Sequence, residues 1–152
     1  FSIIIVSLIL ISCGFTPTYK ISDNAHRGSS VIYEINKNNS YETRQILSKN
    51  LINADKSNAR YIIEINVTEA ETAVNILSSG SVSKYRVESL INFKINEIET
   101  KETIYKSRSR GFSTYDVSNS EYTNKLLKEN ALTTSLTKAI QLMNVIIYSK
   151  IN

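Results

Sequence analysis

Two long runs of alternating apolar and polar residues constrain the fold of this chain most. Apolar side chains recur at every second position from Tyr61 to Val67, and again, with Ser89 as the one exception, from Tyr85 to Ile95. A period of two is typical of a β-strand, because successive side chains point to opposite faces of a sheet. Residues 104–115 alternate less regularly and predict a third strand. The three segments together predict a sheet with one buried and one exposed face.

The connections between these strands carry turn residues. Residues 78–80 (Ser-Ser-Gly) predict a hairpin turn, and the charged residues 97–102 predict a second one. We expect the first hairpin to be long, because three aliphatic residues continue the strand pattern toward the turn: Val74, Ile76 and Val82.

Two helices and a short strand complete the predicted fold. Residues 31–36 (VIYEIN) form a short β-rich run. Asn39 and Glu42 have the spacing of a capping box and predict a helix to about Ala54. Ser118 and Glu121 predict the start of a second helix. Its apolar stripe, expected to cover the sheet, consists of Tyr122, Leu126, Leu132, Leu136, Ala139, Ile140, Met143, Ile147 and Ile151.

The element order β-α-β-β-β-α predicts an α+β fold over residues 31–152. We expect a two-layer sandwich, with a four-stranded mixed sheet and both helices on one face. The length of 152 residues fits one such domain.

The first twelve residues, FSIIIVSLILIS, carry no charge. They are too few to span a bilayer, which takes about 20, but they fit the apolar core of a secretory signal. The chain starts at Phe without a basic stretch, so we expect that the upstream end of this signal is missing. We interpret residues 1–12 as a lipoprotein signal peptide and residues 13–30 as a lipidated tether.

Cys13 is the candidate lipidation site. Residues 10–13 (Leu-Ile-Ser-Cys) resemble a bacterial lipobox, in which a small residue precedes the acylated Cys. Several acyl chains, such as palmitate, hold a protein firmly on a membrane, whereas a single chain binds marginally. Gly14 stands where Asp would mark retention in the inner membrane, and therefore favours the outer membrane. The alternative is a buried free Cys in a short core segment.

The number and placement of potentially catalytic and metal-binding residues argue against an enzyme. Cys13 and His26 are the only Cys and His, so a Cys-based zinc site or a His-rich metal site is excluded within one chain. Carboxylates are close together at Glu69 and Glu71 and within residues 97–102, but hairpin ends usually carry charge for solubility. No phosphate-binding loop or dinucleotide fingerprint is present. We therefore predict no catalytic residue, no metal and no cofactor.

Basic residues are concentrated on two neighbouring predicted strands. Arg86 and Lys94 share one face of their strand, and Lys106, Arg108 and Arg110 share one face of the next. If the strands pair as a hairpin, the two basic faces merge into a surface suited to phosphorylated ligands. The alternative is an ordinary solvated sheet face. Nucleic acid is disfavoured as a partner, because a secreted lipoprotein does not ordinarily meet it.

Several motifs together resemble the lipopolysaccharide-assembly lipoprotein (LptE) family in its alphaproteobacterial form. Residues 13–19 (CGFTPTY) are similar to a lipidated start CGFRPLY, and residues 83–87 (SKYRV) to a T-R-Y-R-L strand start. Residues 112–117 (FSTYDV) are similar to an S-x-S-Y-N-V segment. The last helix follows the family pattern at Ser120, Tyr122, Glu129, Ala131, Leu136 and Ile140, and departs from it at Thr123 and Lys128.

The resemblance implies a fold with two helices on a four-stranded sheet. It also implies a function: an outer-membrane lipoprotein that plugs the large β-barrel LptD and assists its assembly. Such a protein contacts lipopolysaccharide during delivery to the outer leaflet, without turnover chemistry. The alternative is a lipoprotein auxiliary subunit of another envelope lipid-transport system of the ABC type, and a third reading is a periplasm-facing enzyme.

Two sets of residues follow as binding hypotheses. For lipopolysaccharide we expect contacts from Arg86, Lys106, Arg108 and Arg110. For the barrel partner we expect contacts from two loops, through Ser79, Gly80, Tyr115 and Asn119, since loops held by rigid elements usually carry recognition.

Overall fold

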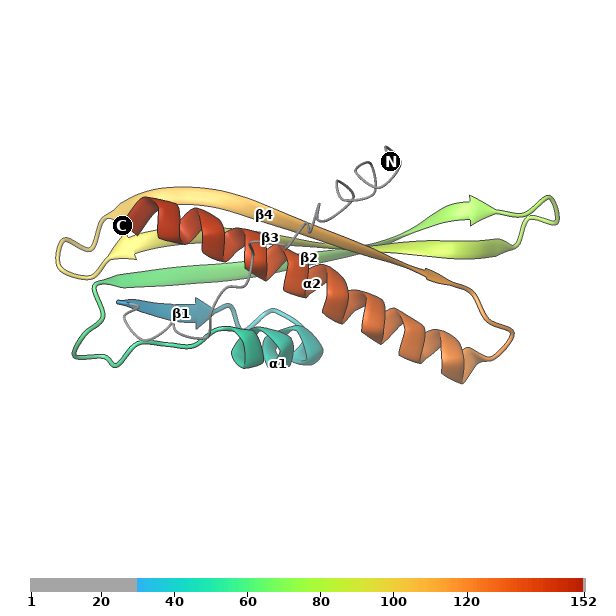
Figure 1. Cartoon of the computed structure of the whole chain (residues 1–152), viewed down its shortest axis with the longest axis horizontal. Coiled ribbons are helices and arrows are strands. Elements are labelled where there is room, and N and C mark those ends of the chain that lie inside the picture. The colour runs from blue at the N-terminus through green and yellow to red at the C-terminus, as the bar shows by residue number, and fades with distance from the viewer. Residues whose placement is uncertain (1–29, 152) are drawn as a thin grey trace, which may run out of the picture.

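The structure is a computed structural model and describes residues 30–151. The expected signal peptide, Cys13 and nearly all of the expected tether lie outside these residues. Six elements follow one another along the chain (Figure 1): β1 (Val31–Ile35), α1 (Tyr41–Asn50), β2 (Tyr61–Ile76), β3 (Val82–Glu97), β4 (Thr103–Asp116) and α2 (Glu121–Ile151).

The four strands form one mixed sheet in the order β1-β2-β3-β4. β1 runs parallel to β2, and the other neighbours are antiparallel. β1 pairs only with residues 61–65 of β2, whereas β2 and β3 stay paired as far as Ile76 and Val82. The predicted α+β fold, its element order and its long first hairpin are therefore confirmed.

The register gives the sheet two chemically different faces. Ile65 is paired with Phe93, and Ile63 with Ile95; these side chains are buried under the helices. The intervening residues point to the other side, which neither helix covers, and we call this side the open face. Alternation along the strands thus places the helices and the polar residues on opposite sides of one sheet.

Both helices contribute to one core. α1 adds Leu47, and α2 adds Leu136, Ile140 and Met143 to the same buried cluster as the strand residues. The core therefore lies between the helices and the half of the sheet that carries β1. The hairpin of β2 and β3 continues beyond it, and its turn lies at the end of the molecule opposite the C-terminus (Figure 1).

The predicted apolar stripe of α2 is wrong in its first two turns. Tyr122 is 73% exposed and Leu126 is 43% exposed, whereas the stripe from Leu136 onward is buried. The reason is positional: the helix begins beyond the core, so its first turns have no buried surface to cover.

Both predicted N-caps are displaced by one or two residues. Ser40, and not Asn39, caps α1, with its hydroxyl accepting the Thr43 N–H at 3.1 Å. Ser120, and not Ser118, accepts the Thr123 N–H at the start of α2. Asn39 accepts the Val67 N–H instead, so its side chain binds a backbone group of β2 just beyond the residues that pair with β1.

The predicted end of the first helix at Ala54 is also wrong. The helix ends at Asn50, because Leu51 has an extended backbone and turns its side chain into the core. The N–H of Ala54 then donates to the Val31 carbonyl at 2.8 Å. No helix within residues 30–151 is long and apolar enough to cross a membrane.

Candidate functional site

The open face joins the basic residues of two strands. β3 and β4 are paired so that Lys94 is opposite Lys106 and Asn92 is opposite Arg108. Directly opposed residues of paired strands point to the same side, so the two basic faces merge as the sequence predicts. Arg86 lies further along β3, opposite Thr114. The merged surface extends along most of β4.

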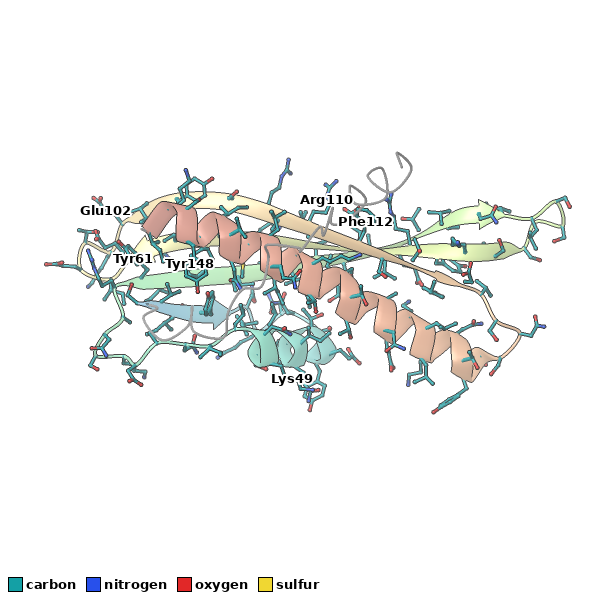
Figure 2. All side chains as sticks on the ribbon, viewed as in Figure 1. Lys49, Tyr61, Glu102, Arg110, Phe112 and Tyr148 are labelled. Atoms are coloured by element: carbon teal, nitrogen blue, oxygen red, sulfur yellow. The ribbon has the colours of Figure 1, made fainter. Side chains whose placement is uncertain are left out.

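The cations of this surface differ in their partners. Arg110 forms an ion pair with Glu88, with 3.1 Å between the Arg110 Nε and a Glu88 carboxylate oxygen. The Arg86 guanidinium lies 4.5 Å from the centroid of the Phe112 ring, a cation–π contact. Arg110 and Phe112 are neighbours on β4 in Figure 2. Lys106 and Arg108 form no ion pair with any residue in the range 30–151, and are therefore the cations available to an anion.

Two lysines of α2 contact β4, and sequence reasoning missed them: Lys138 contacts Phe112 beside the positive surface, whereas Lys150 contacts Tyr105 on the side of the sheet that the helices cover. The Lys138 ammonium donates to the Phe112 carbonyl at 3.1 Å, and it lies 5.7 Å from the Phe112 ring centroid. Lys150 lies 5.0 Å from the ring centroid of Tyr105. Both lysines thus contact β4, which is an edge strand of the sheet. Their positions depend on how α2 packs against β4, which strand periodicity does not reveal.

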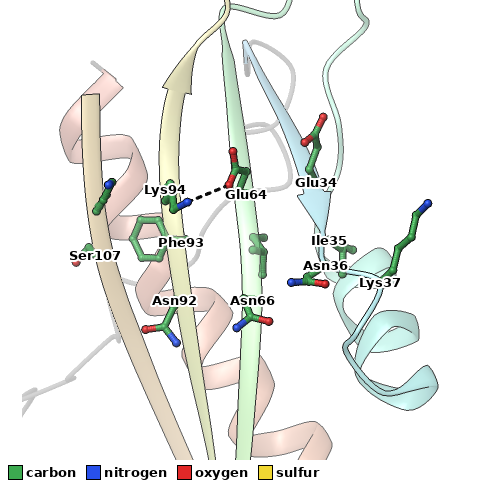
Figure 3. Close-up of a pocket in the computed structure, with 12 residues that line it drawn as sticks. Glu34, Ile35, Asn36, Lys37, Glu64, Asn66, Asn92, Phe93, Lys94 and Ser107 are labelled. Carbon is green, nitrogen blue, oxygen red and sulfur yellow. Dashed lines mark hydrogen bonds and ion pairs between the residues drawn. The ribbon is translucent and has the colours of Figure 1, made fainter. Parts of the chain in front are cut away.

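An open groove of about 690 Å³ crosses the open face beside these cations (Figure 3). Its lining includes one charged residue from each strand at a single level of the sheet: Glu34, Glu64, Lys94 and Lys106. Asn66 and Asn92, which oppose each other at the next level, also line it. The groove is thus polar: the carboxylates of Glu34 and Glu64 line its β1 side, together with Lys37 just after the end of β1, and the ammonium groups of Lys94 and Lys106 line its β4 side.

The structure separates the residues predicted to bind a partner into two places. Ser79 and Gly80 lie in the exposed turn between β2 and β3, where the Gly80 N–H donates to the Leu77 carbonyl at 2.9 Å. Asn119 is exposed in the connection between β4 and α2. Tyr115 is half-buried near the end of β4, where its ring stacks on Tyr85 with 5.6 Å between centroids.

Tyr115 belongs to a polar cluster that ties α2 to the sheet. Its hydroxyl donates to the Glu71 carboxylate, and Lys128 of α2 binds the same carboxylate at 2.6 Å. Burial would raise the pKa of Glu71, but the hydrogen bonds from Lys128 and Tyr115 and the charge of Lys128 outweigh it, so the pKa is lowered. Burial, and then the hydrogen bond to Glu71, raise the pKa of Tyr115. Glu71 is therefore a structural ion and not a free acid.

We expect Glu71→Gln to lower the free energy of unfolding at pH 7 by about 1 kcal/mol, the usual size for an exposed ion pair with hydrogen bonds. The pKa of Glu71 is lower in the folded chain, so its ionised form stabilises the fold above the ordinary pKa of 4.5. This contribution is lost as the pH falls through the folded-state pKa. Urea unfolding of both proteins at pH 7 and at steps below 4.5 should show the difference shrinking to zero.

Glu99→Gln is the matched control, because Glu99 makes no hydrogen bond or ion pair with any residue of the described range. A Glu71→Gln effect that persists unchanged at low pH would contradict the role of the ionised carboxylate.

Three of the carboxylates considered for catalysis, Glu69, Glu71 and Glu97, have other partners in the structure. Glu69 accepts a hydrogen bond from Thr43 of α1, and Glu97 accepts one from Thr100 at 3.0 Å. Across residues 30–151 no three His, Cys, Asp or Glu side chains gather as metal ligands would. The open face, with its cations and its groove, is therefore the candidate binding site.

The fold is one found among bacterial lipoproteins. The chain is similar to the solved structure of a lipoprotein from Caulobacter crescentus, with 15% identity over 79% of this chain and 88% of that chain and a TM-score of 0.61. It is also similar to rare lipoprotein B from Shewanella oneidensis, with 12% identity over 78% and 96% of the two chains and a TM-score of 0.51. No protein-family model and no curated protein matches the sequence. The comparisons establish a lipoprotein fold shared with rare lipoprotein B.

Proposed function

We propose that this protein is an outer-membrane lipoprotein of the lipopolysaccharide translocon. It plugs an LptD-type β-barrel, assists the assembly of that barrel, and contacts lipopolysaccharide through the open face. Residues 1–12 are removed, Cys13 carries the acyl chains, and residues 13–30 tether the domain 31–152 to the membrane. The protein faces the periplasm within the barrel.

The open face carries this proposal. On a lipoprotein fold, it presents a row of cations of which Lys106 and Arg108 have no anionic partner within residues 30–151. Arginine and lysine bind phosphate groups strongly, and lipopolysaccharide is a phosphorylated lipid. The lipobox-like residues before Cys13 and the shared fold with rare lipoprotein B support the envelope location.

Photo-crosslinking in cells tests the barrel partner. A photo-reactive residue at Ser79 or Asn119 is expected to capture one large barrel protein, because both positions are exposed in loops at the end of the domain away from the core. Lys101 is the control, since it lies in the turn between β3 and β4 at the opposite end. If neither site captures a barrel while the protein stays folded and lipidated, the role of auxiliary subunit in an ABC-type lipid-transport system replaces the proposal.

Substitution of the cations tests the contact with lipopolysaccharide. Replacing Arg86, Lys106, Arg108 and Arg110 together by Gln should weaken binding by about 1–3 kcal/mol, because exposed charge contacts contribute about 0.2–1 kcal/mol each. Within this set, the pair Lys106→Gln and Arg108→Gln should account for most of the loss. The pair Arg86→Gln and Arg110→Gln is the matched control, since both side chains are already engaged within the protein.

Binding is measured by titration of the purified chain with lipopolysaccharide at low and at high salt. Equal affinity of the wild type and the fourfold variant at low salt would identify the open face as a solvated surface.

A further inference from the structure

One row of residues across the groove on the open face has opposite charges at its two ends, and Lys37 lines the groove outside this row, after the end of β1. β1 and β2 place Glu34 and Glu64 side by side, and β3 and β4 place Lys94 and Lys106 side by side at the same level. Figure 3 shows Glu34, Glu64 and Lys94 on neighbouring strands, with the ion pair between Glu64 and Lys94. This charge separation distinguishes the groove from the rest of β4, where cations predominate.

The outer charges of this row are free to bind a ligand. Lys94 and Glu64 form an ion pair at 3.4 Å, and Glu64 also accepts a hydrogen bond from Asn96 at 2.6 Å. Glu34 and Lys106, in contrast, form no hydrogen bond or ion pair through their side chains with the residues in the range 30–151. Both are exposed. The ligand-binding capacity of the groove therefore lies at its two ends.

The floor between the ends is polar as well. Asn66 of β2 and Asn92 of β3 face each other there, and both are exposed. An amide side chain both donates and accepts hydrogen bonds, so the pair suits hydroxyl or ester oxygens. Arg108, the register partner of Asn92, adds a second free cation near the basic end.

We infer that the groove binds a zwitterionic head group, namely a phosphate ester that also carries a primary ammonium. The phosphate lies against Lys106 and Lys94, and the ammonium lies against Glu34 and Glu64. The inference rests on the proposed function, because it takes the open face as the surface that meets lipid, and it adds the chemistry of the group recognised. An anion alone would fit less well, since the acidic end of the groove would repel it.

The dimensions agree with a short linker between the two groups. Neighbouring strands lie about 4.8 Å apart, so the centres of the acidic and basic pairs are about 10 Å apart. A charge-assisted hydrogen bond of about 2.8 Å at each end leaves about 4 Å between ammonium and phosphate. A two-carbon linker, as in phosphoethanolamine, spans such a separation. The same pair of groups occurs on a phospholipid head group and on the phosphate of an amino sugar.

Four soluble probes test this inference on the full chain in detergent, with amide NMR shifts as the readout. O-phosphoethanolamine carries both groups, glucosamine phosphate carries them on a sugar, and inorganic phosphate and ethanolamine carry one each. We expect at least tenfold tighter binding of a two-group probe than of either single-group probe, with shifts centred on residues of the groove. The tighter of the two-group probes identifies the lipid or the sugar source.

Two variants separate the ends of the groove. Glu34→Gln should remove the tenfold preference without weakening the binding of inorganic phosphate, and Lys106→Gln should weaken every phosphate-containing probe. Glu99→Gln and Lys101→Gln, in the turn between β3 and β4, are the matched controls and should change nothing.

The outcomes distinguish this inference from the proposed function. If inorganic phosphate binds as tightly as phosphoethanolamine, or if Glu34→Gln has no effect, the zwitterionic site is overturned while phosphate contact by the open face stands. If no probe binds, the groove is overturned as a site, and the barrel partnership still depends on the crosslinking result at Ser79 and Asn119.

Discussion

Gly111→Ala is expected to lower the free energy of unfolding by about 2–3 kcal/mol, as overpacking of a tight contact does. α2 crosses β4 so closely at Gly111 that a Cβ there would lie 1.9 Å from the Ser135 carbonyl oxygen and 2.7 Å from the Ala139 nitrogen. Both are backbone atoms of α2, so a rotamer change cannot relieve the clash. The measurement is urea unfolding followed by circular dichroism.

Gly80→Ala is the matched control for this prediction. A Cβ at Gly80 would meet no atom within 4 Å, but the residue has a φ of +84° that favours glycine. We therefore expect a loss of about 1 kcal/mol there, from backbone strain alone. Equal losses at the two glycines would show that α2 adjusts freely to the added methyl group at Gly111.

Cys13→Ser is expected to abolish lipidation and to leave an unprocessed or a soluble product. The thiol of Cys13 is the only one in the chain, so no other residue can accept the thioether-linked lipid. Metabolic labelling with palmitate and fractionation of the envelope measure the effect.

Ser12→Ala is the control for the anchor, because it keeps a small side chain before the cysteine and should be processed and labelled as the wild type is. Palmitate still entering the Cys13→Ser variant would place the lipid elsewhere and remove the lipobox interpretation.

Periodicity predicted most of the sheet because the local pattern and the tertiary contacts agree there. The alternation from Tyr85 to Ile95 corresponds to side chains buried under the helices, and the Ser-Ser-Gly turn at residues 78–80 lies between β2 and β3. The merging of the two basic faces was also predicted, because it depends only on the alternation of side chains along each strand and on the pairing of the two strands as a hairpin. These features depend on residues near in sequence.

The capping residues were mispredicted because two candidates stand close together at each helix start. The Asn39 side chain accepts the Val67 N–H and the Ser118 hydroxyl accepts the Ser120 N–H, so Ser40 and Ser120 take the capping positions. At the first helix, the choice between two polar residues is thus decided by a contact 28 residues away in the sequence.

The site was predictable only in part for the same reason. The alternation along the strand placed Lys106 and Arg108 on one face. Which of the cations lacks an anionic partner within residues 30–151 depends on the register of β3 and β4, which brings Glu88 within reach of Arg110. The acidic end of the groove was missed, because Glu34 meets Glu64 only through the parallel pairing of β1 with β2. Such pairing across a helical connection leaves no trace in the spacing of charged residues.

Because the core lies at one end of the sheet, we expect the free energy of local unfolding to decrease along the molecule, from the core toward the turn between β2 and β3. Ile63 and Ile95 are fully buried in the core, and their amide hydrogens should exchange with solvent only when the whole domain unfolds. Those flanking Gly80 belong to a two-stranded ribbon with exposed side chains, and should exchange through local fluctuations. The core is thus rigid and the end of the β2–β3 hairpin is flexible. The hairpin can bend toward a binding partner while the packing around Leu47 and Met143 stays intact.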